Sequence, residues 1–327
     1  MTRRLRRCAF PALVLILMLL SPVGLAPRPA GALPDSTGVT TRASVKSGGA
    51  QADAQGPAGA GQPAVSDNGA VVAFVSDATN LVADDHNGVS DVFVSQGGTI
   101  KRVSLGAGFS EANGPSSTPA LSTDGRFVAF TSAADNLVPG DTNDALDVFL
   151  YDRQQSTVSR VSLAGDGTQA DGDSRAPSVD DTGTVVAFTS SATNLVTGDG
   201  NGKSDVFVRT LGSSPATELA SAATGGGASG DDASDEPSLN GNGTMVVFSS
   251  DAANLVASDT NGKTDVFWRD LTADTTELVS LKNASPSVQG NGDSFSPSLS
   301  GDGTLIAFAS DATNLGTISD DNTATDV

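Results

Sequence analysis

The chain has 327 residues and a formal net charge of −20 at pH 7, from 18 lysines and arginines against 38 aspartates and glutamates. Phosphate contacts need clustered basic side chains, so this charge argues against a nucleic acid or an anionic lipid as partner. The one cysteine, Cys8, lies in a leader that we expect to be removed, which excludes disulfides, thiolate metal sites and cysteine nucleophiles from the rest of the chain.

The leader is predicted to be a secretory signal peptide over residues 1–32. An arginine-rich start precedes an apolar stretch from Ala9 to Leu20, and Ala30-Gly31-Ala32 supplies small residues at both cleavage positions. This stretch is shorter than the ~20 residues of a membrane span, so we expect no span after cleavage. The mature protein would be secreted, periplasmic or on the cell surface and would begin with a flexible segment, 33–39. The sequence leaves Sec and twin-arginine export open.

The rest of the chain, residues 40–327, contains five copies of a unit of about 58 residues, a period that indicates a propeller, a solenoid or another array. The copies open at Pro63, Pro119, Pro177, Pro237 and Pro297. Each copy runs through a glycine-bearing turn, an apolar stretch ending in Phe-x-Ser, an Asn-Leu pair and an acidic loop to Asp-Val.

Each copy is predicted to form four short antiparallel strands. The first two strands are joined by turns that tolerate positive φ, namely Asp67-Asn68-Gly69, Thr123-Asp124-Gly125, Asp181-Thr182-Gly183, Gly241-Asn242-Gly243 and Gly301-Asp302-Gly303. The second strands, 71–76, 127–132, 185–190, 245–250 and 305–310, are apolar on both faces and must be covered on both sides. Third strands begin at Asp91, Asp147, Asp205 and Asp265, and fourth strands cover 100–105, 158–163, 216–221 and 276–281.

This pattern predicts an all-β fold, a β-propeller of about five four-stranded antiparallel blades, whose neighbours cover both faces of every second strand. Phe188 is expected in this core. A solenoid is the competing interpretation, although its repeats are usually shorter. Residues 40–45 resemble a fourth strand with no blade before it, so we expect them to close the last blade and remove its exposed edge. The last copy stops at Asp326-Val327, so a truncated longer propeller and a frayed last blade both stay open.

The segment Leu299-Ser300-Gly301-Asp302-Gly303-Thr304-Leu305-Ile306-Ala307-Phe308 and its four counterparts resemble the "S-x-D-G-x-x-[IV]-[AV]-F" signature of the TolB-type, WD-repeat-like propeller repeats. The resemblance covers residues 40–327, but these repeats are longer than that family's usual unit, and no separate N-terminal domain of TolB is evident. It implies a propeller that serves as a protein-binding platform, an enzyme accessory domain or, occasionally, an enzyme.

The loop between the second and third strands carries the pattern D-x-N-x-x-x-D, whose oxygen-bearing side chains suit a hard cation such as calcium. The candidate ligands are Asp85, Asn87 and Asp91; Asp141, Asn143 and Asp147; Asp199, Asn201 and Asp205; Asp259, Asn261 and Asp265; and Asp320, Asn322 and Asp326. The alternative is that Asn-Gly forms the turn and Asp caps it. Calcium is the one cofactor that the sequence suggests.

The sequence contains no convincing catalytic motif. The single histidine, His86, lies in a variable turn and is expected to be solvated, and no G-x-S-x-G elbow is present. Two functions remain: a non-enzymatic exported module that binds a protein or polysaccharide partner, and an extracellular hydrolase or lyase with carboxylates in the propeller funnel. An enzyme should break the repeat symmetry at one mouth with unique polar residues.

Overall fold

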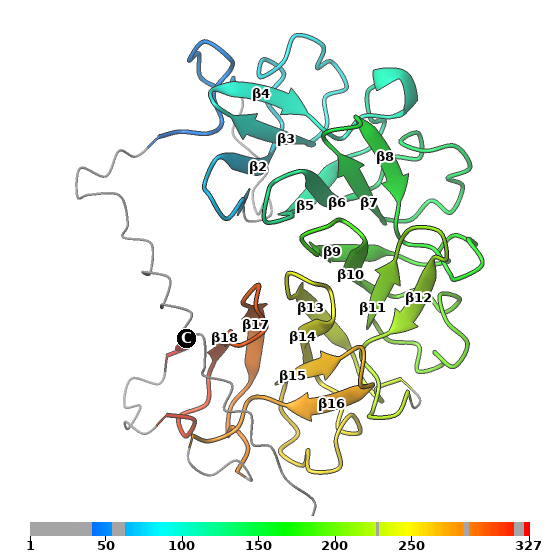
Figure 1. The fold of residues 1–327 in the computed structure, drawn as a ribbon, viewed down its shortest axis with the longest axis vertical. Helices are drawn as coiled ribbons and strands as arrows, with labels where there is room; N and C mark the ends of the chain where they lie inside the picture. Colours follow the sequence, from blue (N-terminus) through cyan, green and yellow to red (C-terminus); the bar gives the residue numbers. More distant parts are fainter. Residues whose placement is uncertain (1–40, 54–62, 227–228, 284–287, 317–323) are drawn as a thin grey trace, which may run out of the picture. The chain divides into compact units, whose positions relative to one another are not determined.

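The protein is all-β, as predicted (Figure 1). The computed structural model describes residues 41–53, 63–226, 229–283, 288–316 and 324–327. Within these ranges the chain forms four four-stranded antiparallel sheets and one two-stranded sheet, and its single helical element is the short 3-10 turn η1 (Ala107–Phe109). Apart from Thr41, the described residues belong to one compact unit, Arg42–Val327.

The strands of each sheet follow one another in the chain, which is the meander of a propeller blade. Blade 1 contains β1 (Ala64–Val65), β2 (Val71–Ser76), β3 (Asp91–Gln96) and β4 (Thr99–Arg102). Blade 2 contains β5 (Ser116–Leu121), β6 (Phe127–Ser132), β7 (Asp147–Asp152) and β8 (Thr157–Arg160). Blade 3 contains β9 (Ser174–Val179), β10 (Val185–Ser190), β11 (Asp205–Thr210) and β12 (Ala216–Leu219). Blade 4 contains β13 (Ser234–Leu239), β14 (Met245–Ser250), β15 (Asp265–Asp270) and β16 (Thr275–Leu278), and blade 5 contains β17 (Ser294–Leu299) and β18 (Ile306–Ser310).

One register recurs in the first four blades. In blade 3, Phe188 of β10 lies opposite Phe207 of β11, and Ser190 lies opposite Asp205. The two phenylalanine rings stack with their centroids 5.9 Å apart, and the corresponding pairs in the other three blades have the same arrangement. Both rings are fully buried in blade 3, so the prediction that Phe188 is a core residue is confirmed.

The core lies between successive blades rather than within any one of them. Each blade presents its phenylalanine face to the preceding blade and its small alanine and valine side chains to the following one. One hydrophobic cluster, for example, joins Ala129, Val148 and Leu150 of blade 2 to Phe188 and Phe207 of blade 3. Equivalent clusters join blade 1 to blade 2 and blade 3 to blade 4. This packing explains why both faces of the second strands are apolar: a neighbouring blade covers each face, as predicted from the sequence.

The glycine turns between first and second strands are also contacts between blades. Gly183 has φ of 67°, and a Cβ atom there would lie 2.4 Å from the ring of Phe127 in the preceding blade. Gly125 and Gly243 have the same conformation and lie over Val71 and Val185. These glycines are required by their positive φ and by the close approach of the neighbouring blade.

Asparagine side chains fix the linkers that join one blade to the next. Asn87, in the acidic loop of blade 1, donates a hydrogen bond from Nδ2 to the carbonyl oxygen of Ala112 in the following linker, at 3.0 Å. Asn136, from the Asn-Leu pair of blade 2, donates to the carbonyl oxygen of Glu111 in the same linker, at 2.8 Å, and its Oδ1 accepts from the amide of Asn113. Each linker is therefore held from both sides.

Residues 41–53 have the structure of such a linker. Val45 pairs with Gln51 as Leu105 pairs with Glu111, and Ala52 packs against the Phe74 cluster of blade 1. The predicted closure of blade 5 by residues 40–45 is not seen: residue 40 lies outside the described ranges, and 41–45 form no described pair with β18. The physical reason is that a fourth strand pairs with a third strand, and in the described part of blade 5 the third strand is represented only by the bridge of Asp326 to Ser310.

We expect Gly183→Ala to lower the free energy of unfolding in urea by at least about 1 kcal/mol more than Gly202→Ala, because only the first Cβ would overpack a neighbour. Gly202 is the matched control, since its φ is 66° but no atom lies within 4 Å of its added Cβ. Equal losses for the two variants would show that the turn does not pack on Phe127.

Candidate functional site

The acidic loops of blades 1 to 4 are built around a buried aspartate at the start of the third strand. Asp91, Asp147, Asp205 and Asp265 are all 0% exposed. In blade 3, Asp205 accepts hydrogen bonds from the hydroxyl of Ser221 at 2.6 Å and from Nδ2 of Asn201 at 2.8 Å. Ser104, Ser162 and Ser280 donate to the equivalent aspartates in the other blades. The carboxylate thereby ties the third strand to the fourth strand and to the loop.

The predicted ligand asparagines point their amide nitrogens, not their oxygens, at these carboxylates. Asn201 Oδ1 accepts from the amide of Lys203 at 2.7 Å, while Nδ2 donates to Asp205 and to the carbonyl oxygen of Gly230. Asn87, Asn143 and Asn261 have the same pattern. Their amide oxygens close the turn, which is the alternative that the sequence left open for this motif.

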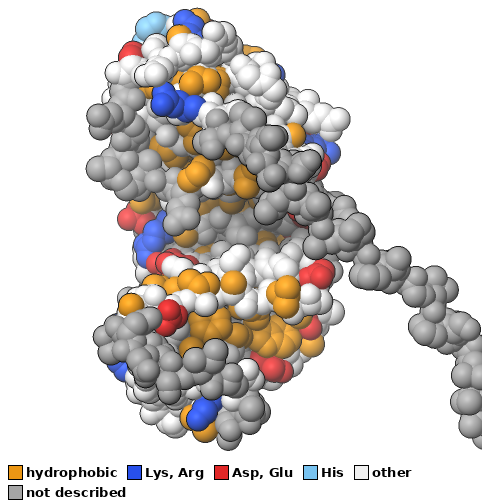
Figure 2. Space-filling view, turned by 90° about the vertical axis from the view of Figure 1, so that its left-hand side faces the viewer, with side chains coloured by type: hydrophobic (Ala, Val, Ile, Leu, Met, Phe, Trp, Pro, Cys, Tyr) orange, Lys and Arg blue, Asp and Glu red, His pale blue; other side chains and the backbone are white. Residues whose placement is uncertain are grey.

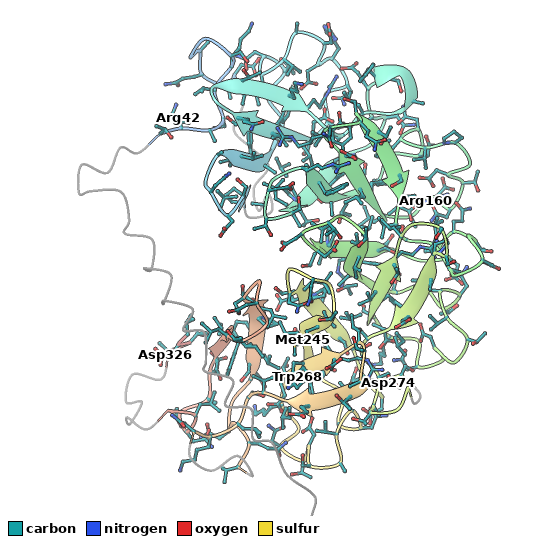
Figure 3. All side chains as sticks on the ribbon, in the orientation of Figure 1. Arg42, Arg160, Met245, Trp268, Asp274 and Asp326 are labelled. Carbon is teal, nitrogen blue, oxygen red and sulfur yellow. The ribbon has the colours of Figure 1, made fainter. Side chains whose placement is uncertain are left out.

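In blades 1 and 2 an arginine from the fourth strand occupies the space between the two aspartates of the loop. Arg102 Nη1 lies 3.0 Å from Asp85 and 3.1 Å from Asp91, with both partners and the guanidinium buried. Arg160, labelled in Figure 3, is the equivalent residue of blade 2. Its Nη1 lies 2.8 Å from Asp141 and 3.3 Å from Asp147. In these two blades the guanidinium therefore places a positive charge between the two carboxylates.

Blades 3 and 4 lack that arginine. The strand register that places Arg102 opposite Phe93 places Leu219 opposite Phe207 and Leu278 opposite Phe267. In blade 4, Gln289 Nε2 donates to Asp259 at 3.2 Å. In blade 3 the corresponding bridge residue is Ser229, which is too short to do so, and Asp199 Oδ1 is buried without a hydrogen-bond partner.

Burial dominates the electrostatics of these loops. It raises the pKa of Asp205 to about 6, against hydrogen bonds from Ser221 and Asn201 that favour the charged form. Burial also raises the pKa of Asp199, and the nearby charge of Asp171 adds to the effect. Even beside Arg102, burial raises the pKa of Asp85 to about 6.

Three predicted ligands belong to blade 5, and the single histidine lies at the edge of the acidic loop of blade 1. Asp320 and Asn322 lie outside the described ranges, and Asp326 is exposed. The side chain of His86 is 72% exposed, as expected for a solvated residue, and its Nδ1 lies 3.9 Å from Glu111. Over the described part of the chain, no group of three or more histidine, cysteine, aspartate or glutamate side chains is arranged to hold a metal ion.

A second candidate site is formed by the first strands of blades 2 to 5. In each of these strands a β-bulge interrupts the pairing just before the repeat proline. The residue ahead of the proline has positive φ although it is not glycine: 45° at Thr118, 51° at Ala176, 58° at Glu236 and 51° at Ser296. Proline lacks an N–H group, so it fits where the ladder bond is missing.

These bulged residues and the prolines that follow them line one depression of about 380 Å³, which we call the inner mouth. It is formed by Thr118, Pro119, Ala176, Pro177, Glu236, Pro237, Ser296 and Pro297. The first strands of successive blades contact one another, as the innermost strands of a propeller do. Strained backbone of this kind persists where the surrounding structure holds it and is common at functional sites.

Polar contacts across blades order the inner mouth. Glu236 Oε2 accepts a hydrogen bond from the amide of Ser296 in blade 5 at 2.6 Å. Asp235 of blade 4 accepts from Arg175 at 2.8 Å and from Thr189 at 2.7 Å, both in blade 3. Burial alone would raise the pKa of Asp235, but these hydrogen bonds outweigh it, so the pKa lies below its usual value. Asp235 is therefore a charged, paired group at neutral pH.

Sequence reasoning missed the inner mouth because it placed the start of each copy at the proline, whereas β5, β9, β13 and β17 begin ahead of it. The two positions before the proline differ in every copy: Ser117-Thr118, Arg175-Ala176, Asp235-Glu236 and Phe295-Ser296. That variation inside an otherwise regular repeat was the available signal.

Comparisons with known proteins concern the fold. No protein-family model matches the chain, and no curated protein matches it. Among solved structures, the chain is similar to TolB from Acinetobacter baumannii, with 15% identity and a TM-score of 0.44 over 76% of this chain and 48% of that one. It is also similar to a putative TolB from Agrobacterium tumefaciens, with 18% identity and a TM-score of 0.43 over 75% and 72% of the two chains.

A structure from a study of two prolyl endopeptidases has 15% identity and a TM-score of 0.45 over 76% of this chain and 32% of that one. The chain thus spans about half of the TolB from Acinetobacter baumannii and a third of the endopeptidase. In the described ranges, no helix has the length and apolar character needed to cross a membrane.

We expect Arg160→Leu to lower the free energy of unfolding by about 3–5 kcal/mol, because it leaves the buried carboxylates of Asp141 and Asp147 without their cation. The measurement is urea unfolding at pH 7. Lys203→Ala is the matched control: its ion pair with Asp232 is half exposed and should contribute less than about 1 kcal/mol. A loss below 1 kcal/mol for Arg160→Leu would mean that the guanidinium does not neutralise this site.

Proposed function

We propose that this protein is a non-enzymatic binding module that contacts a segment of a protein partner at the inner mouth. One observation carries the proposal: four blades present the same bulge to one depression, and among the residues that line it the prolines are constant while the residue ahead of each proline differs. A repeated scaffold with variable residues at a shared mouth provides an asymmetric surface, which a specific partner requires.

The composition of the inner mouth favours a protein segment over a polysaccharide. Its lining contains four prolines, the exposed carboxylate of Glu236 and the hydroxyl of Ser296, and no aromatic ring. On the face shown in Figure 2, acidic and basic side chains are scattered rather than gathered into one patch. The described residues of that face therefore form no single charged patch that could bind a partner in place of the inner mouth.

The enzyme hypothesis finds less support at the same place. A hydrolase or lyase needs a carboxylate free to transfer a proton. Asp235 is paired with Arg175 and has a lowered pKa, and Glu236 is engaged by the amide of Ser296. Both carboxylates bind groups of a neighbouring blade, which favours a structural role for them over proton transfer.

We also propose that the protein acts outside the cytoplasm. The support is the sequence of residues 1–32, which lie outside the described ranges. Mass spectrometry of the exported protein should find an N-terminus at Leu33; recovery of uncleaved protein in the cytoplasm alone would contradict export.

A photo-cross-linking residue at position 296 in the exported protein should give a discrete polypeptide adduct from the extracellular fraction, whereas the same residue at the exposed position 272 should not. Glu236→Ala should reduce the adduct, because it removes the carboxylate that orders the mouth. An adduct sensitive to periodate would identify a polysaccharide partner instead. Equal adducts at positions 296 and 272 would overturn the inner mouth as the contact surface.

A second proposal concerns calcium. The sequence offered five acidic loops as candidate sites, and we propose only the loop of blade 3. We infer that a cation binds between Asp199 and Asp205, where Leu219 replaces the arginine of blades 1 and 2. The supporting observation is the buried Oδ1 of Asp199, which has no hydrogen-bond partner. Two carboxylates with backbone carbonyls and water are suitable ligands for a hard cation.

We expect millimolar calcium to raise the melting temperature of the wild type relative to chelator, since binding at about 100 times Kd stabilises by ~2.7 kcal/mol. Leu219→Arg should abolish the calcium response and raise the melting temperature in chelator, because it supplies the cation that blade 2 already has. A calcium response that Leu219→Arg leaves intact would place the site elsewhere. An unchanged wild-type melting temperature would remove the proposal.

A further inference from the structure

The joints between blades 1 and 2, 2 and 3, and 3 and 4 each have a slot at their outer end, which different blades fill differently. In blade 2 this rim slot is lined by residues 105–109 of the loop leaving blade 1, by residues 137–139 and by Tyr151 and residues 156–158. Its volume is about 320 Å³. It is distinct from the inner mouth and contains none of the acidic-loop residues.

In blades 3 and 4 the equivalent slot is filled by an arginine of the same chain. Arg209 Nη1 donates to the carbonyl oxygens of Leu163 at 3.1 Å and Ala164 at 2.7 Å, and to the hydroxyl of Thr217 at 2.8 Å. Arg209 is only 3% exposed and has no described carboxylate partner. The carbonyl oxygens of the loop and one threonine thus accept hydrogen bonds from Nη1 of this guanidinium without a carboxylate, while its Nε is buried and has no partner.

Blade 4 repeats this arrangement. Arg269 Nη1 donates to the carbonyl oxygen of Ala222 at 3.2 Å and to the hydroxyl of Thr276 at 2.8 Å. Asp274, at the turn after β15, gives this arginine an additional ion pair (Figure 3). Two successive blades thus use the slot in the same way.

Blade 2 keeps the loop carbonyl oxygens of the slot, but it has neither the arginine nor the threonine, whose place Val158 takes. Tyr151 lies opposite Val158 in the register that pairs Arg209 with Thr217. Leu105 bridges Glu111 as Leu163 bridges Gln169, so its carbonyl oxygen corresponds to the one that Arg209 uses. Among the described residues no donor reaches the Leu105 carbonyl oxygen.

Aromatic side chains adjoin these acceptors. Tyr151 is buried at one side of the slot, and Phe109, 68% exposed, belongs to the loop at the other. Aromatic faces attract a guanidinium, especially where water is partly excluded. The chain as a whole carries a charge of −20, which favours the approach of a basic group.

We propose that the rim slot of blade 2 binds an arginine side chain of a protein partner, in the position that Arg209 and Arg269 occupy in the next two blades. The guanidinium donates to the carbonyl oxygens of Leu105 and Gly106 and lies against the rings of Tyr151 and Phe109. This site is independent of the inner mouth, so either can be correct without the other.

The test is a titration of the ¹⁵N-labelled full chain with a capped Gly-Arg-Gly peptide and with its citrulline counterpart, followed at the amides of Gly106, Ala107 and Gly108. We expect concentration-dependent shifts at these amides, with the arginine peptide bound about tenfold more tightly, because citrulline has the shape but not the charge. A lysine peptide should also bind more weakly, since it lacks the planar fork of donors.

The matched variant is Tyr151→Arg combined with Val158→Thr, which copies the pair found in blade 3 and should fill the slot from within. We expect it to abolish the shifts while its melting temperature stays at or above that of the wild type. Equal binding of arginine, lysine and citrulline peptides, shifts confined to other residues, or no shifts at millimolar peptide would each overturn the proposal, whatever the stability of the variant.

Discussion

Each of the first four blades depends on one aspartate carboxylate held away from water at the start of its third strand. A buried charge is costly unless hydrogen bonds satisfy it. Asp205 meets this condition with the hydroxyl of Ser221 and the amide of Asn201, and the second N–H of Asn201 continues to the carbonyl oxygen of Gly230 in the following linker. A single buried group thereby organises the strand pairing within a blade and the joint to the next blade.

The loops around these aspartates show which features the sequence could predict and which it could not. The continuous apolar runs and the turn chemistry predicted β2, β6, β10 and β14 with their observed bounds, because these strands are apolar on both faces and begin after glycine turns. The motif D-x-N-x-x-x-D was visible, but its role depended on Arg102 and Arg160, which come from the fourth strand and meet it only through the sheet register. That register decides whether a carboxylate faces a guanidinium, an amide or an open space. The spacing of residues along the chain does not reveal the register.

The inner mouth escaped prediction for a different reason. A residue before proline is normally extended with negative φ, so nothing local predicts the positive φ at Ala176 or Glu236. The conformation arises because the bulge must bring the proline to a place where no ladder N–H is needed. In all four blades the regular strands around the bulge hold this strained conformation. The two side chains ahead of the proline can therefore differ between blades without a change of fold.

The two unlike faces of a blade also determine what lies at the two ends of the series of blades. Because blades 1 to 4 have rings on one side and small side chains on the other, the first and last blades are unlike at their outer faces. Ala52 lies on the ring side of blade 1, whereas Ala307 of blade 5 is exposed. A further blade with the same two unlike faces could pack on that end as blades 2, 3 and 4 pack on the blades before them, so adding such a repeat would need no new kind of interface.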